Sequence, residues 1–203
     1  MSEGVKSIHP YAPYISEGAT RMIIGTMPPY RFCVPGEKAL FETDVAFYYG
    51  SKDNCFWDLM AEITDRKLQY VNSQRAIDER KDLLDFLGIG IADIVKECVH
   101  QDGKSDDASL KDIVVNRDLV KELSQHPAIN TLIYTSKFVT KQMNKISDKG
   151  YHERWDKTGQ KGFVQIGGKE YTVYVLYSPS PNALRGVSAQ NRLAQYKTIF
   201  GLK

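Results

Sequence analysis

The feature that most constrains the fold of this chain is a set of four short apolar runs that end at glycine or just before serine or lysine. Stretches with the three-to-four-residue apolar spacing of amphipathic helices lie between these runs. Buried strands that alternate with helices pair in parallel, and the helices cover both faces of the sheet. We therefore expect an α/β fold, a three-layer α/β/α sandwich whose central sheet is mostly parallel and four-stranded. The expected strands are Arg21–Gly25, Gly88–Val95, Thr131–Thr135 and Tyr171–Tyr177.

The stretches between the runs complete a single expected domain over residues 1–203. A short hairpin strand at 162–166 is expected to turn at Gly167-Gly168 into the last strand. The connection from residue 30 to 46 has no regular pattern, and the polar stretch from 101 to 109 is expected to be a surface loop. The expected helices cover residues 56–64, 75–87, 115–125, 137–145 and 188–200.

The composition argues against several kinds of site. Cys33, Cys55 and Cys98 form no CxxC pair, and the four histidines have no metal-ligand spacing, so we expect neither a metal nor a cofactor. No stretch approaches the roughly 20 apolar residues of a membrane span, and the first residues contain no apolar signal segment. These features lead us to expect a cytoplasmic monomer. The net charge of +2 neither requires nor excludes nucleic acid, because a local basic patch is what binds phosphates.

An unusual stretch from Phe47 to Trp57 places two adjacent tyrosines before a polar turn and an aromatic pair. The apolar spacing that follows Phe56 predicts a helix, so the turn lies at a helix N-terminus with free backbone N–H groups. Aromatic rings beside the Asn54 amide would suit a flat, hydrogen-bonding ring such as a nucleobase. A core tyrosine pair followed by a capped helix accounts for the same pattern. We take Tyr49 as the candidate stacking ring and Tyr48 as a core residue.

Two proline-containing loops follow directly on expected strands, at Gly25–Pro29 and at Ser178–Pro181. Ligands bind outside the carboxyl ends of strands in open α/β sheets, and proline limits the ordering cost of a binding loop. Either loop alone is explained as a turn at a strand end. Together with the turn at Tyr49–Asn54, they predict three rigid polar loops that meet at one edge of the sheet.

Four segments of the chain resemble the uracil-DNA glycosylase superfamily, and most closely its deoxyinosine (hypoxanthine) and mismatch-specific branch. They are His9-Pro10-Tyr11-Ala12-Pro13, then Ile23-Ile24-Gly25-Thr26-Met27-Pro28, then Phe47-Tyr48-Tyr49-Gly50 with Asn54-Cys55-Phe56-Trp57, and finally Leu176-Tyr177-Ser178-Pro179-Ser180-Pro181-Asn182-Ala183. Three departures stand out. The connection from Tyr30 to Ala46 is longer than is typical of the family. Ser51-Lys52 replaces a His-Pro pair, and Met27 stands where mismatch-specific enzymes carry a water-activating Asn. A mechanism that depends on that Asn is therefore not available to this chain.

The resemblance implies a monofunctional DNA glycosylase that hydrolyses the N-glycosidic bond of deaminated bases, hypoxanthine or uracil, in DNA. It implies Asn54 and Ser178 as catalytic residues. The base would be bound by Gly25, Thr26, Met27, Tyr49 and Asn54. The DNA would be contacted by Ser180, Asn182, Leu184 and Arg185, with Leu184 either a wedge in the base stack or an ordinary core residue. Two alternatives remain: a weak or inactive module of the same fold that binds nucleic acid or nucleotides, and an enzyme acting on small nucleosides.

Overall fold

The computed structural model describes residues 4–33, 40–101, 106–156, 159–183 and 186–201. Its main sheet has six strands in the order β3-β2-β6-β9-β8-β7. The first four are parallel, and β8 and β7 continue the sheet as an antiparallel extension. In chain order these strands are β2 (Arg21–Gly25), β3 (Ile89–Asp93), β6 (Thr131–Tyr134), β7 (Lys149–Asp156), β8 (Gly159–Ile166) and β9 (Lys169–Val175).

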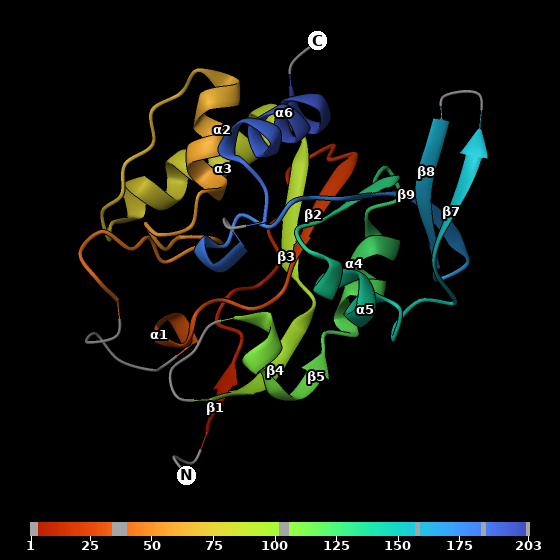
Figure 1. The fold of residues 1–203 in the computed structure, drawn as a ribbon, viewed down its shortest axis with the longest axis horizontal. Helices are drawn as coiled ribbons and strands as arrows, with labels where there is room; N and C mark the ends of the chain where they lie inside the picture. Colours follow the sequence, from red (N-terminus) through yellow and green to blue (C-terminus); the bar gives the residue numbers. More distant parts are fainter. Residues whose placement is uncertain (1–3, 34–39, 102–105, 157–158, 184–185, 202–203) are drawn as a thin grey trace.

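The prediction of a four-stranded sheet is wrong in extent, although its four expected strands form the parallel part. The turn from β8 into β9 is confirmed at Gly167 and Gly168, which both have positive φ and so suit a tight hairpin. β7 was not expected. Its sequence, KGYHERWD, is mostly polar and charged, and it pairs with β8 alone, so no continuous apolar run marks it. Figure 1 shows β7 and β8 projecting beyond the helices.

A second, three-stranded antiparallel sheet has the order β1-β4-β5 and was also not expected. Its strands are β1 (Val5–Ile8), β4 (Val95–His100) and β5 (Lys111–Val115). The chain therefore leaves β3 after Asp93 and turns almost at once into another sheet, whereas the sequence predicts one run from 88 to 95. The small sheet lies near the N-terminus, below the main sheet in Figure 1.

Helices cover both faces of the main sheet, because side chains alternate along its buried strands. Ile23 and Ile133 face a core formed with α2, α3 and α6, while Ile24 and Leu132 face a core formed with α4 and α5. The bounds are α2 (Phe56–Thr64), α3 (Gln74–Leu87), α4 (Asp118–Gln125), α5 (Lys137–Met143) and α6 (Ala189–Phe200). The described residues also include three short turns of helix: α1 (Tyr30–Cys33), η1 (Asp107–Ser109) and η2 (Pro181–Ala183).

The register of the parallel strands brings their carboxyl ends to one edge. Gly25 at the end of β2 pairs with Asp93 at the end of β3, and Ile24 pairs with Tyr134 at the end of β6. The chain crosses over in opposite directions on the two sides of β2, since β3 flanks it on one side and β6 on the other. A crevice outside such a reversal point is where open α/β sheets bind ligands. No helix in the described part of the chain is long and apolar enough to cross a membrane.

Candidate functional site

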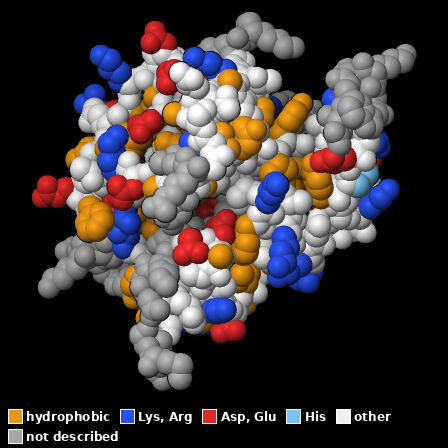
Figure 2. Space-filling view, in the orientation of Figure 1, with side chains coloured by type: hydrophobic (Ala, Val, Ile, Leu, Met, Phe, Trp, Pro, Cys, Tyr) orange, Lys and Arg blue, Asp and Glu red, His pale blue; other side chains and the backbone are white. Residues whose placement is uncertain are grey.

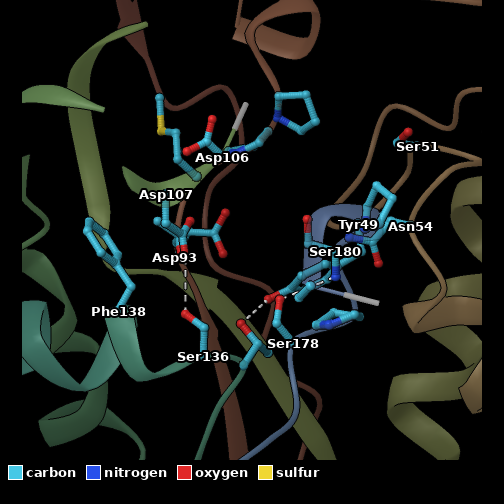
Figure 3. A pocket seen from close by; sticks show the side chains of 18 of the residues that line it. Tyr49, Ser51, Asn54, Asp93, Asp106, Asp107, Ser136, Phe138, Ser178 and Ser180 are labelled. Carbon is cyan, nitrogen blue, oxygen red and sulfur yellow. Dashed lines mark hydrogen bonds between the residues drawn. The ribbon is translucent and has the colours of Figure 1, made fainter. Parts of the chain in front are cut away.

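A cavity of about 580 Å³ opens at the carboxyl edge of the parallel strands. This volume lies within the range of about 300–1,000 Å³ that is usual for small-molecule sites. The three loops expected to meet do so here, and the loop after β6 and the segment around η1 join them (Figure 3). The lining segments are Thr26–Pro29, Asp106–Ala108, Thr135–Phe138 and Ser178–Pro181, with Arg31, Tyr49, Ser51, Asp53, Asn54, Asp93 and Ala183.

Tyr49 lines the cavity in a backbone conformation that a large side chain rarely adopts. Its φ is 53°, in the left-handed region. The neighbouring structure holds it there: the Trp57 indole donates to the Tyr48 carbonyl at 2.7 Å, and the Tyr49 ring stacks on Phe56 with centroids 4.5 Å apart. The phenol donates to Thr135 Oγ1 at 2.9 Å. Burial and the charge of Asp93 hold the Tyr49 pKa well above its ordinary value, so the hydroxyl remains a donor.

Such strain persists only where the surroundings determine the conformation, and it concentrates at functional sites. Tyr48, by contrast, is a core residue as predicted, since it is buried and its hydroxyl donates to the Ala12 carbonyl at 3.1 Å. The pair therefore divides into one structural and one cavity-lining ring.

Gly25 does not line the cavity, although it was expected to bind a base. Its carbonyl accepts a hydrogen bond from Ile94 N–H at 3.0 Å. A Cβ atom at this position would overlap the Asp93 carboxylate and the Tyr49 hydroxyl. The glycine therefore lets these two groups approach the end of β2. Thr26 and Met27, the next two residues, do line the cavity.

The oxygen and the nitrogen of the Asn54 side-chain amide differ in their hydrogen bonding. Its oxygen accepts from the Phe56 N–H at 2.9 Å and so satisfies a free donor at the start of α2. Its nitrogen has no hydrogen-bond partner among the described residues, and the side chain lines the cavity. An N–H donor is thus presented to whatever the cavity holds.

Ser51, the first of the two residues that stand in place of a His-Pro pair, is buried and hydrogen-bonded. Arg31 donates to Ser51 Oγ at 2.7 Å, and two further bonds of 2.7 and 2.8 Å join the same guanidinium to the buried carboxylate of Asp44. A bidentate Arg–carboxylate pair is geometrically rigid. It ties the polar turn to the loop after β2.

The closing loop is joined directly to the Asn54 turn. The Pro179 carbonyl accepts from the Cys55 N–H at 3.2 Å, and Ser178 Oγ accepts from the Ser180 N–H at 3.3 Å. Ser178 and Ser180 both line the cavity. Asn182 belongs to η2, but its side chain lies outside the described structure, as do Leu184 and Arg185 entirely.

The wall opposite Tyr49 and Asn54 is acidic (Figure 3). Asp93 is the last residue of the apolar β3, and Asp107 comes from the stretch that was expected to be only a surface loop. Ser136 donates to Asp107 Oδ2 at 3.1 Å. Burial raises the pKa of the Asp107 carboxyl above its ordinary value, hydrogen bonds from Thr26 and Ser136 lower it in part, and the Asp93 charge raises it further.

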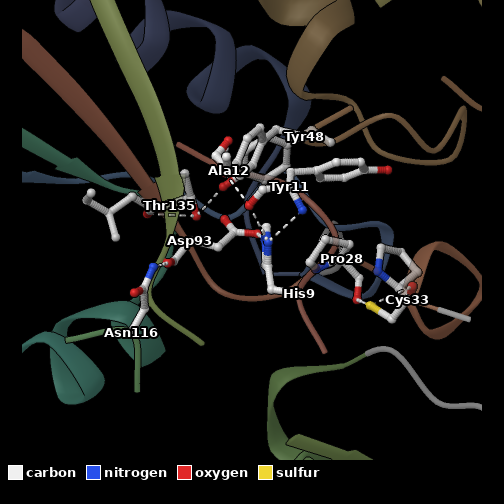
Figure 4. Close-up of polar contacts among 12 residues, drawn as sticks. His9, Tyr11, Ala12, Pro28, Cys33, Tyr48, Asp93, Asn116 and Thr135 are labelled. Carbon is white, nitrogen blue, oxygen red and sulfur yellow. Dashed lines mark hydrogen bonds and ion pairs between the residues drawn. The ribbon is translucent and has the colours of Figure 1, made fainter. Parts of the chain in front are cut away.

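His9 holds Asp93 from the N-terminal segment, 84 residues away in sequence. Its Nε2 lies 2.9 Å from Asp93 Oδ2, and both side chains are nearly buried. His9 Nδ1 lies 3.1 Å from the Tyr11 N–H and 3.0 Å from the Tyr11 carbonyl, so both ring nitrogens are anchored (Figure 4). No local sequence pattern joins this pair. Its two members were marked separately, His9 by the first of the four resembling segments and Asp93 by its position within an apolar run.

The acidic wall is not arranged as a metal site. Within the described ranges, no three side chains of His, Cys, Asp or Glu are grouped so as to hold a metal ion.

A solved structure with a similar fold is the solution NMR structure of a putative uracil DNA glycosylase from Methanosarcina acetivorans. The similarity has a TM-score of 0.61 and covers 97% of each chain, with 16% sequence identity. No protein-family model and no curated protein sequence matches this chain. At such low identity the likeness establishes a shared mixed α/β fold and assigns no role to any residue.

Proposed function

We propose that this protein is a monofunctional DNA glycosylase that hydrolyses the N-glycosidic bond of a deaminated base, uracil or hypoxanthine. The observation that carries the proposal is the cavity wall formed by Tyr49 and Asn54, in which an aromatic residue with a left-handed backbone conformation lies beside a free amide N–H donor. The shared fold of a protein described as a putative uracil DNA glycosylase supports the same assignment.

The commitment of the Asn54 oxygen supports a deaminated base as the ligand. Deamination replaces an exocyclic amino group by a carbonyl oxygen. Because the Asn54 oxygen is occupied, the side chain can act toward a ligand only as a donor. Such a donor forms a hydrogen bond with the carbonyl of uracil or hypoxanthine, but not with the amino group of cytosine or adenine. A flipped base stacked on Tyr49 would place its edge toward this donor, with Thr26 and Met27 on the adjoining wall. Ser178, also in the cavity, would hydrogen-bond the departing base.

The acidic wall supports hydrolysis through a cationic transition state. Loss of a base from deoxyribose develops positive charge on the sugar, which carboxylates such as Asp93 stabilise in a partly enclosed site. The same carboxylates repel phosphate, so the phosphates of a bound strand would remain outside the cavity.

A track of lysines beside the cavity supports a polyanionic partner. Lys137 lines the cavity, and Lys141 and Lys145 follow it at four-residue spacing along α5 and just beyond its end. All three are exposed, and none has a salt bridge or hydrogen bond within the described part of the chain. Figure 2 shows Lys and Arg side chains on this face, over α5 and beside acidic side chains. A DNA backbone following this track would leave a base within reach of the cavity.

The experiment measures base release from oligonucleotides that carry one uracil or one inosine, in single- and double-stranded form. The wild-type chain is expected to release at least one of the two bases. Asn54→Asp keeps an acceptor for the Phe56 N–H but removes the amide donor, so it should unfold like the wild type and lose excision. Asn54→Ala removes both functions and should also lose about 1 kcal/mol of stability.

Two further readouts separate the alternatives. Borohydride trapping should yield no covalent adduct with DNA, because a monofunctional enzyme forms no Schiff base through Lys137 or another lysine. Tight binding to abasic or uracil-containing DNA without release of any deaminated base would contradict the proposal. That result would instead identify a non-catalytic nucleic-acid-binding module.

A further inference from the structure

Asp93 lies at the edge of the sheet close to three other parts of the structure: the end of β2, the Tyr49 hydroxyl and His9. It ends β3 opposite Gly25, and the absence of a Cβ there lets its Oδ1 lie against the end of β2 near the Tyr49 hydroxyl. Its Oδ2 is held by His9 Nε2 at 2.9 Å. Oδ1 has no hydrogen-bond donor among the described residues, although Asp93 lines the cavity. One oxygen is therefore anchored and the other is available.

We propose that Asp93 is the catalytic carboxylate that orients the attacking water, and that His9 is the residue that positions it. This rests on the proposed glycosylase function. The water oxygen bonds to the anomeric carbon as the carbon–nitrogen bond breaks, and the bonding electron pair leaves with the base. Asp93 Oδ1 accepts the proton of the water and passes it to the solvent, while the departing base takes up a proton, so the products are a neutral base and an abasic sugar.

Four other carboxylates near the site differ from Asp93 in how they are held. Asp53 lines the cavity but is exposed, and no contact among the described residues anchors its carboxylate. Asp44 is held twice by Arg31 and does not line the cavity. Asp106 accepts from the Ser109 N–H, and Asp107 accepts from Ser136 and is favoured in its protonated form by burial. Asp106 also has one oxygen without a donor among the described residues, but it is half-buried at the start of the short η1 segment and is held by a backbone N–H, whereas Asp93 is buried at the end of a strand and is held by a side chain. Asp93 therefore provides the acceptor that Met27, an apolar residue, does not.

The geometry around His9 assigns a role to the His9–Pro13 segment. The imidazole lies among aromatic rings, 5.8 Å from the Tyr11 centroid and 5.5 Å from that of Tyr48 (Figure 4). With Nδ1 beside the Tyr11 backbone, the ring cannot turn without losing contacts at both nitrogens. A fixed N–H donor to one carboxylate oxygen keeps the other aimed, which is the usual way a positioning partner supports a catalytic group.

The first experiment compares single-turnover base release by the wild type and Asp93→Asn on the better of the uracil and inosine oligonucleotides. Loss of a general base or of its charge should lower the rate by about 10²–10⁴-fold. Affinity for abasic-site DNA should stay close to that of the wild type, because the substitution does not alter the stacking ring or the lysine track. The matched control is Asp118→Asn, which breaks an ion pair with Lys96 of similar length away from the cavity and should keep the wild-type rate.

The second experiment tests His9 through a double-mutant cycle. His9→Phe should lower the rate in the wild-type background and have little effect in the Asp93→Asn background, whereas a purely structural role would give additive losses. His9→Gln restores a side-chain donor and should recover part of the rate. These His9 variants also keep the proposal testable if Asp93→Asn fails to fold.

The outcomes separate this inference from the function on which it rests. A wild-type chain that releases no deaminated base overturns both. A wild-type chain that releases the base, with Asp93→Asn releasing it at an unchanged rate, overturns the role of Asp93 and leaves the glycosylase assignment intact. Additive effects in the cycle overturn the role of His9.

Discussion

Replacing Gly25 by alanine tests the packing that brings Tyr49 and Asp93 together. A Cβ at this position would overlap Asp93 Oδ1 and Tyr49 Oη, and neither atom can move without a loss. Tyr49 would have to give up its 2.9 Å hydrogen bond to Thr135, or Asp93 its 2.9 Å contact with His9. The substitution therefore displaces a residue that lines the cavity, Tyr49 or Asp93, from a position outside the cavity.

The expected magnitude follows from these contacts. A neutral hydrogen bond contributes about 1 kcal/mol, a bond to a charged group about 1.5–3 kcal/mol, and an overpacked methyl group costs about 1–3 kcal/mol. Because one displacement relieves much of the overlap, we expect Gly25→Ala to lower the free energy of unfolding by about 2–4 kcal/mol. For a chain of this length, the midpoint of thermal unfolding should then fall by about 4–16 °C.

The assay is urea unfolding followed by circular dichroism, with excision measured on the same preparations. Gly186→Ala is the control, since the nearest atom to its Cβ would be 4.0 Å away. In a Tyr49→Phe background, where the overlapping hydroxyl is absent, Gly25→Ala should cost less. A Gly25→Ala variant within about 0.5 kcal/mol of the wild type, or an equal cost in both backgrounds, would refute the reasoning.

Two other predictions concern charge. Because the pKa of Asp107 is raised on folding, the ionised form of its carboxyl group destabilises the folded state. Asp107→Asn should therefore raise the free energy of unfolding near neutral pH. This gain in stability should shrink as the pH falls through the folded pKa toward the ordinary value of 3.8. Urea unfolding across that range checks the sign, and a gain that grows on acidification would contradict it. Replacing Lys137, Lys141 or Lys145 by alanine should weaken DNA binding regardless of sequence and reduce the slope of log affinity against log salt by about one for each lysine that contacts a phosphate. Fluorescence anisotropy measures the slope, Lys96→Ala serves as the control, and unchanged slopes in all three variants would rule out the track.

Much of the fold could be predicted because its signals are local. The strands β2, β3, β6 and β9 are apolar runs bounded by turn residues, and α2 was expected at its observed bounds. The strands that were missed lack such runs. β7 is half polar and pairs along one edge, and β5 shows exposed residues along most of its length. Their pairing depends on where the rest of the chain lies.

The residues of the site also differ in whether a local sequence signal predicts them. The loops with Tyr49, Asn54 and Ser178 could be expected to meet, because they follow strands or lie at a helix start. The acidic wall could not, since Asp93 is brought to His9 across 84 residues and Asp107 belongs to a polar stretch typical of a surface loop. Contacts of this kind depend on topology and leave no periodic pattern in the sequence.

The turn at Tyr49–Asn54 departs from the pattern of the resembling family at Ser51-Lys52, and these two residues hold the turn in place. Ser51 accepts from Arg31, which is itself fixed by Asp44, and the Lys52 ammonium lies 3.7 Å from the Tyr70 ring centroid. A histidine and a proline are thus not needed to keep Asn54 at the start of α2. The consequence for mechanism lies elsewhere: with the turn intact and Met27 unable to hold a water, the hydrolytic step depends on whether a carboxylate of the opposite wall can act in its place.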